Sequence, residues 1–230
     1  MKKACSILLA ALISLFLFSQ AYAYTITFDS ALDAQGVLTT TQAYATVWDF
    51  NNSNLSTRPS VFNSITVDSA AIVSGSVVNR YAAPFVVPTG LPDSTPYLTV
   101  PAPTDADNSG YIIVNLSTAA NYFGLFWGSI DTYNTLSFYN GSILVASFDG
   151  TAITTPYAAN GNQTAPATNT YVNFFNLPTF DNFKLNSTQF AFEVDNIAVG
   201  TSPVPEPATM FLLGTGLLGL AGFGRKRLTK

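Results

Sequence analysis

Aromatic rings and short oxygen-bearing side chains gather in the middle of this chain. Trp127, Tyr133 and Tyr139 surround a loop that carries Asp131 and Asn134. Saccharides are bound by this combination, because the C–H faces of a pyranose pack on aromatic rings while its hydroxyl groups need oriented hydrogen-bond partners. These five residues therefore form a candidate glycan-binding site. The alternative is that Trp127 and most of the Phe and Tyr residues fill the interior of the fold.

Carboxylate and amide side chains occur at spacings that suit a hard cation such as calcium. Asp105 and Asp107 match the opening positions of an EF-hand-type loop, although Leu116 stands where the bidentate Glu is required. A second candidate set joins the last strand to the N-terminal part of the domain: Asp29, Glu193, Asp195 and Asn196. Both sets have a plainer interpretation, because Asp, Asn, Ser and Gly are the usual residues of turns and strand ends. The sequence thus allows a structural Ca²⁺ without requiring one.

Histidine is absent from the chain, and the single cysteine is Cys5. Their absence from the body of the chain excludes Ser–His and Cys–His nucleophilic systems and imidazole metal sites. The remaining catalytic option is a secreted polysaccharide-active enzyme that uses carboxylates alone, with Glu193 or Asp131 paired to Asp149 roughly 5 to 9 Å away. Accidental pairs are common among many surface acids, so we expect a protein that is not an enzyme.

Residues 24–202 are strongly acidic. They contain eleven Asp and one Glu against three cations, Arg58, Arg80 and Lys184, so their net charge is near −9 although the whole chain carries −4. An acidic surface disfavours nucleic acid and anionic lipid as partners. It suits divalent cations or neutral glycans.

The first 23 residues have the pattern of a cleaved signal peptide. Lys2 and Lys3 provide the positive start, residues 7–18 are apolar, and Ala21 and Ala23 form an A-x-A cleavage site. We therefore expect export, with the mature protein beginning after Ala23.

Residues 203–230 combine a proline-rich segment, an apolar run and a basic end. The proline-rich segment is extended, because proline fixes φ and lacks an N–H; it contains Val204, Pro205, Glu206 and Pro207. Residues 208–223 are apolar and span about 24 Å as a helix, slightly less than the hydrocarbon core of a bilayer. The basic residues that follow are Arg225, Lys226 and Arg227. This tail predicts one transmembrane helix with its basic end in the cytoplasm and the body of the protein outside.

The order of these three parts resembles the PEP-CTERM signal of exosortase-dependent surface proteins. The resemblance implies recognition of Pro205, Glu206 and Pro207 by an exosortase-type processing enzyme, with cleavage near them. It also implies a precursor held transiently in the inner membrane and a product at the cell surface or outside the cell. The alternative is an uncleaved tail, which would make this a membrane-anchored structural protein.

Composition and patterning predict an all-β domain over residues 24–202. Short runs rich in Thr, Val, Ile, Phe and Tyr alternate with Gly, Pro, Asn and Asp. No stretch of a dozen residues has the apolar spacing of an amphipathic helix. Asn140-Gly141 predicts a two-residue type I′ hairpin. The spacing favours a jelly-roll-like β-sandwich over a barrel. The expected strands are residues 24–28, 44–50, 71–78, 97–100, 111–116, 122–127, 135–139, 143–148, 171–175, 183–185 and 189–199.

The last expected strand changes its phase. Apolar residues fall on even positions up to Val194 and on odd positions from Ile197, so the slip at Asp195-Asn196 predicts a β-bulge. Residues 190–197 resemble the closing strand of jelly-roll carbohydrate-binding and adhesion modules. Residues 122–141 resemble a recurrent stretch of exosortase-dependent surface proteins, to which no activity is assigned. We expect non-catalytic adhesion or association with exopolysaccharide.

Overall fold

The protein is described here by a computed structural model that covers residues 24–153, 159–203 and 215. The predicted signal peptide with Ala21 and Ala23, the sorting segment 204–207, the basic end 225–227 and, apart from Thr215, the apolar run 208–223 lie outside the described residues. Within those described, no helix has the length and apolar character needed to cross a membrane.

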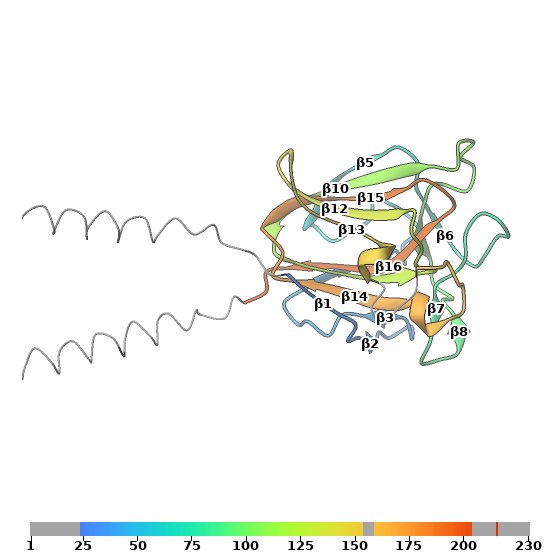
Figure 1. Cartoon of the computed structure of the whole chain (residues 1–230), viewed down its shortest axis with the longest axis horizontal. Coiled ribbons are helices and arrows are strands. Elements are labelled where there is room, and N and C mark those ends of the chain that lie inside the picture. The colour runs from blue at the N-terminus through green and yellow to red at the C-terminus, as the bar shows by residue number, and fades with distance from the viewer. Residues whose placement is uncertain (1–23, 154–158, 204–214, 216–230) are drawn as a thin grey trace, which may run out of the picture.

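Two antiparallel sheets face each other in the described part of the chain (Figure 1). The seven-stranded sheet consists, in its described residues, of β1 (Thr25–Thr27), β14 (Thr170–Phe175), β11 (Tyr122–Gly128), β16 (Phe192–Gly200), β9 (Tyr97–Val100) and β6 (Ala71–Val73), in that order, with β4 (Thr46–Trp48) also paired to β16. The five-stranded sheet consists of β13 (Ile143–Asp149), β12 (Asn134–Asn140), β15 (Phe180–Ser187), β10 (Gly110–Ala120) and β5 (Phe62–Val67). The all-β sandwich prediction is confirmed.

The strand order follows from how the chain moves between the two sheets. Strands β9, β16, β11 and β14 are neighbours in one sheet, while β10, β15, β12 and β13 are neighbours in the other. The chain therefore passes from one sheet to the other after β9, β10, β11, β13, β14 and β15. This winding of eight antiparallel strands into two sheets is that of a jelly roll.

Aromatic residues from both sheets fill the space between them. The ring of Phe123 on β11 lies 5.0 Å from that of Phe138 on β12 and 4.8 Å from that of Phe183 on β15, in edge-to-face contact. Such contacts stabilise a core by about 0.5–1.5 kcal/mol per pair beyond the burial of area. Alternate residues of β12 and β15 point inward because side chains alternate across a strand.

The predicted bulge in β16 is confirmed. Gly124 of β11 pairs with Ala198, whereas Phe126 pairs with Asp195, so β16 has one additional residue between these two pairs. Asn196 takes the left-handed conformation there, with φ of 48°. The additional residue lets Val194 and Ile197 both face the core.

A second layer covers the outer face of the seven-stranded sheet, and the sequence patterns did not predict it. It contains the hairpins β2–β3 (Ala31–Leu32, Leu38–Thr39) and β7–β8 (Phe85–Val86, Leu91–Pro92), which lie below the sheet in Figure 1. Leu38 and Val86 pack on the outward side chains of Phe126 and Tyr171. Residues on this outer face are therefore buried.

Several predicted boundaries change. The run at residues 71–78 is a strand only to Val73, and the last strand begins at Phe192. The turn between β12 and β13 consists of Gly141 and Ser142, because Asn140 pairs with Ile143. Gly141, the first turn residue, has a positive φ of 59°, whereas Ser142 does not. This is a type II′ turn, because the predicted type I′ turn requires a positive φ at both residues. The remaining elements in the described part of the chain are α2 (Gly150–Ile153) and the 3-10 turn η1 (Pro166–Thr168).

Candidate functional site

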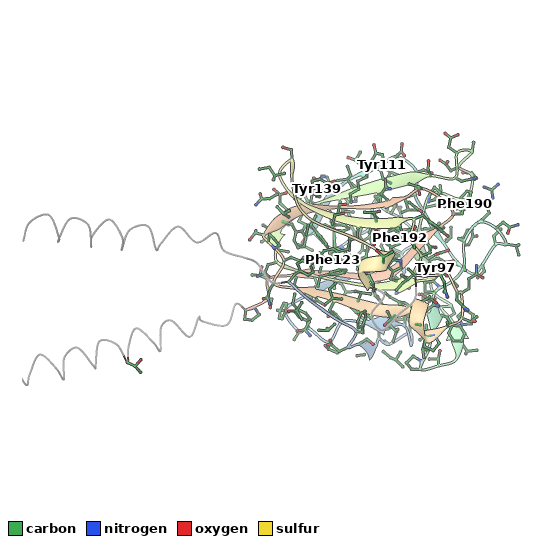
Figure 2. All side chains as sticks on the ribbon, viewed as in Figure 1. Tyr97, Tyr111, Phe123, Tyr139, Phe190 and Phe192 are labelled. Atoms are coloured by element: carbon green, nitrogen blue, oxygen red, sulfur yellow. The ribbon has the colours of Figure 1, made fainter. Side chains whose placement is uncertain are left out.

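A pocket of about 230 Å³ opens at one end of the sandwich. Its walls come from residues 79–81 after β6, residues 129–133 after β11, the segment at Gly161, and the beginning of β16. Phe190, one of its lining residues, lies at the end of the molecule opposite to Tyr139 (Figure 2). β16 begins beside this pocket and runs to Gly200 at the other end, near Tyr122 and β1. The pocket is thus remote from the place where residues 201–203 leave the domain.

Glu193 enters this pocket from the outer face of β16. Its neighbours on either side are Gly128 and Thr99, and it is only 3 % exposed. The backbone N–H of Ala82 donates to Oε1 at 2.8 Å, while Oε2 has no hydrogen-bond partner. Burial raises the pKa of Glu193 well above its usual value, and the nearby Asp131 carboxyl raises it further.

Asp131 enters the same pocket from the segment that follows β11. Its backbone is fixed by Ile130, which is fully buried and whose carbonyl accepts from the N–H of Gly161 at 2.9 Å. Asp131 is 5 % exposed, and its Oδ1 has no hydrogen-bond partner. Burial raises the pKa of Asp131 to about 7, and the nearby Tyr133 hydroxyl offsets only part of this effect.

Ser129 is the third buried residue of the pocket with an unpartnered oxygen. Its N–H donates to the Oδ1 of Asn169 at 3.1 Å, which fixes its backbone at a positive φ of 48°. Its Oγ is buried and has no hydrogen-bond partner. Three side chains of this pocket thus have oxygen atoms without hydrogen-bond partners. This is unusual, because nearly all buried polar groups in folded proteins have a partner.

Aromatic side chains line the mouth of the pocket. The hydroxyl of Tyr133 donates to the carbonyl of Phe190 at 2.8 Å, and the guanidinium carbon of Arg80 lies 4.6 Å from the centre of the Phe190 ring. Tyr81 lies beside them and is in edge-to-face contact with Tyr97 at 6.4 Å. The pocket is therefore lined by half-buried aromatic residues and by buried oxygen-bearing side chains.

Of the five residues predicted to bind glycan, the structure places Asp131 and Tyr133 in the pocket. Trp127 does not fit the prediction, because it is fully buried in the core against Phe192, with ring centres 4.6 Å apart. Asn134 is also fully buried: it accepts from the hydroxyl of Ser187 at 2.6 Å and donates to the carbonyl of Ala191 at 3.1 Å.

Tyr139 lies at the other end of β12, six residues from Tyr133, which is about 20 Å along a strand. It therefore cannot contribute to the same small site. The structure supports the interior interpretation for Trp127 and places Tyr139 on the opposite end of the molecule (Figure 2).

The predicted calcium residues are not brought together. Asp105 forms a turn by accepting from the N–H of Asp107 at 2.9 Å. The hydroxyl of Ser69 is the largest cause of the lowered pKa of Asp105, and the N–H of Asp107 lowers this pKa as well. Asp29 is exposed and accepts from the hydroxyl groups of Thr27 and Thr41. Within the described ranges, no three His, Cys, Asp or Glu side chains are grouped so that they would hold a metal ion.

Asp195 and Asn196, the other members of that set, serve the outer layer. Asp195 lies within hydrogen-bonding reach of the Asp93 carboxyl, and the hydroxyl of Thr95 contacts both, at 2.7 Å from Asp93 and 3.2 Å from Asp195. Asn196 donates through Nδ2 to Asp33 at 2.9 Å and to the carbonyl of Leu38 at 3.1 Å. The bulge thus positions an amide that holds the β2–β3 hairpin on the sheet.

The structure does not pair Asp149 with Glu193 or Asp131, as the sequence suggested for a carboxylate enzyme. Asp149 accepts from the N–H groups of Thr151 and Ala152 at the start of α2, and the hydroxyl of Thr151 is the largest cause of its lowered pKa. Asp149 does not line the pocket. The two carboxyl groups that lie near each other in the pocket are Asp131 and Glu193.

The sequence patterns did not single out several residues that line the pocket, among them Arg80, Tyr81 and Phe190. Their signal was weak, because Arg80 and Tyr81 lie just after the expected strand 71–78, and Phe190 shared the parity of the core residues of β16. The site depends on pairings between segments more than 50 residues apart, which local patterns do not encode.

The pocket has the chemistry to hold a small polar molecule. Unpartnered carboxyl and hydroxyl oxygens can accept hydrogen bonds from hydroxyl groups or bind a hard cation, and the rings can pack on C–H groups. A carboxyl pair can also transfer protons when its two pKa values differ.

Comparisons with solved structures return β-sandwich modules at low similarity. A protein described as CpGH89CBM32-6 produced by Clostridium perfringens is 10% identical, with 70% of this chain and 97% of that chain covered, at a TM-score of 0.29. The CBM32 of AlyQ in complex with 4,5-unsaturated mannuronic acid is 13% identical, with 60% and 97% covered, at a TM-score of 0.28.

No curated protein matches the sequence. The family comparison does find a match: residues 203–227 fit the model described as the PEP-CTERM protein-sorting motif. These are the residues whose proline-rich segment, apolar run and basic end predicted a sorting tail. The chain is therefore a protein with a PEP-CTERM protein-sorting motif.

Proposed function

We propose that this is an exported protein of the cell surface or extracellular matrix that binds saccharide without turning it over. Residues 1–23 act as its signal peptide, residues 24–202 as its binding domain, and residues 203–230 as the tail that an exosortase-type enzyme removes from a membrane-held precursor. The sorting motif at residues 203–227 supports the route.

The pocket at Asp131 and Glu193 carries the binding part of this proposal. Its aromatic mouth and oxygen-lined base are what a pyranose needs, and its 230 Å³ accommodates one sugar unit or the end of a chain. Glu193 is seven residues from Gly200, about 23 Å along β16, so the pocket faces away from the tail. A protein held through its tail would present this end to a surrounding polysaccharide.

Retention on the exopolysaccharide of the native host tests this function. The full chain, purified in detergent micelles, should be retarded in a gel containing the polymer. Phe190→Ala and Asp131→Asn should each weaken retention at least 10-fold, whereas Tyr139→Ala, at the other end of the sandwich, should leave it unchanged. Equal retention of all four proteins, or none by the natural protein, would contradict the proposal.

The second candidate function is a polysaccharide-active enzyme that uses Asp131 and Glu193. One observation favours it: the two carboxyl groups share the pocket, and burial raises the pKa of Asp131 to about 7 and that of Glu193 well above its usual value, so a protonated carboxyl is available as a general acid near neutral pH. This enzyme would lower the viscosity of the polymer and release reducing ends. Glu193→Gln would abolish both effects, whereas a pure binding protein causes neither.

Intact mass tests the route independently of the pocket. Protein recovered from the medium and surface of the host should end between Pro203 and Pro207 if the tail is removed. A chain that still ends at Lys230 would indicate a permanent anchor and a membrane-bound structural role.

A further inference from the structure

Three oxygen atoms in the pocket lack partners: Asp131 Oδ1, Glu193 Oε2 and Ser129 Oγ. Their residues are 5 %, 3 % and 5 % exposed, and all three line the same pocket. Leaving one buried polar group unsatisfied costs about 1–3 kcal/mol, and more for a charged group. Three together point to a bound species that accounts for them.

The charge of the site indicates the sign of that species. Asp131 and Glu193 are both carboxyl groups, which become negative when they ionise. Arg80, which also lines the pocket, stacks on the ring of Phe190. The other two cations of residues 24–202 are engaged elsewhere: Arg58 donates to the carbonyls of Leu55 and Phe62, and Lys184 lies over the Tyr111 ring. Among the described residues, no cation forms an ion pair with either carboxyl group of the pocket.

We propose that Asp131, Glu193 and Ser129 bind a divalent cation of the calcium class at the base of this pocket. All three donors are hard oxygen ligands, which is the type that calcium prefers, and with neither His nor Cys at the site a softer metal has no preferred ligand. Of the residues that the sequence predicted to bind calcium, only Glu193 belongs to this proposed site.

The protein supplies only part of the coordination shell. Calcium takes six to eight oxygen ligands, and two carboxyls with one hydroxyl leave several positions open. The site accordingly contains two acidic side chains, and among the described residues no group of three His, Cys, Asp or Glu side chains could hold a metal ion. The open positions face the 230 Å³ of the pocket, where water or saccharide hydroxyl groups can complete the shell. The cation site stands by itself, whereas its contact with saccharide rests on the proposed function.

Calcium-dependent melting of the full chain in detergent micelles tests the cation site. After removal of metal with EDTA, added CaCl₂ should raise the melting temperature progressively, because a cation that binds only the folded state stabilises it by mass action. Glu193→Gln and Asp131→Asn should each weaken the apparent calcium affinity at least 10-fold. Asp107→Asn, in the exposed loop that resembles an EF-hand, should respond as the natural protein does.

Terbium luminescence gives a second readout that does not depend on stability. Tb³⁺ bound in the pocket should be sensitised by Tyr81 and Tyr133, displaced by excess Ca²⁺, and lost in Glu193→Gln. No melting shift at 10 mM CaCl₂, or an equal shift in Glu193→Gln and the natural protein, would overturn the cation site.

Repeating the gel retention in CaCl₂ and in EDTA separates the two proposals. Retention that is lost in EDTA supports both. Retention that persists in EDTA, with no calcium shift in melting, overturns the cation site and leaves saccharide binding intact. Calcium binding without retention on any tested polymer overturns the proposed function and leaves the cation site intact.

Discussion

Glu193 and Asp195 leave the same face of β16, two residues apart, and each meets a second buried carboxyl group. Glu193 faces Asp131 in the pocket, and Asp195 lies against Asp93 under the outer layer. Both pairs arise because the strand period places alternate residues on the outer face, where Ala82 contacts Glu193 and Thr95 contacts Asp195. The two pairs differ in access: the first opens to a pocket, and the second is enclosed.

The enclosed pair predicts that part of the stability is lost as the pH rises. Burial is the first cause that raises the pKa of both Asp195 and Asp93, so the folded state keeps protons that the unfolded state releases above about pH 4. Unfolding free energy should therefore fall as the pH rises above that value. Asp195→Asn removes one of these titrations and should flatten the profile between pH 5 and 8, measured by urea unfolding. Asp68→Asn, an exposed acid, should keep the natural slope.

The open pair predicts a pH dependence that a cation suppresses. The pKa of Asp131 rises from 3.8 to about 7, so in EDTA this carboxyl alone should contribute a decline in unfolding free energy of at most about 4 kcal/mol between these pH values. Asp131→Asn should remove this decline. Saturating CaCl₂ should reduce it in the natural protein, because the cation favours the ionised carboxyl. The same slope in Asp131→Asn and the natural protein would contradict the assignment.

The alternation of apolar residues contained enough information to predict the sandwich and its bulge. The parity change between Val194 and Ile197 had one physical solution, since both side chains have to reach the core. The same reasoning failed for Trp127, because an aromatic residue next to polar loop residues has the same local pattern whether it lines a site or the core.

The outer layer explains why the sequence pattern did not predict the burial of Glu193 and Asp195. Asp195 and Glu193 have the sequence pattern of solvent-facing residues, and they are buried only because segments from residues 31–39 and 80–95 cross over them. Those segments are short, contain two-residue strands and have no periodic pattern of their own. Their position depends on long-range contacts, such as Ala82 with Glu193 and Asp33 with Asn196.

Asn196 predicts how the bulge holds the β2–β3 hairpin. Asn196→Gly removes the hydrogen bonds to Asp33 and Leu38 but tolerates the positive φ of 48°. Asn196→Ala removes the same bonds and adds the cost of a left-handed residue, about 1 kcal/mol. Both variants should unfold at lower urea concentration, with alanine about 1 kcal/mol less stable than glycine. Equal stability of the two variants would show that the backbone conformation at this position does not matter.

Gly150 predicts how accurately Asp131 has to be placed. A Cβ atom at Gly150 would lie 2.0 Å from the backbone oxygen of Asp131, so alanine there must displace the segment that carries this carboxyl. Gly150→Ala should weaken both calcium affinity and retention on polysaccharide at least 10-fold, while near-ultraviolet circular dichroism still reports a packed aromatic core. Ala152→Ser changes an exposed residue of the same helix and should preserve both kinds of binding. If Gly150→Ala binds as the natural protein does, Asp131 is not the residue that positions the ligand, because its backbone cannot stay in place beside the added methyl group.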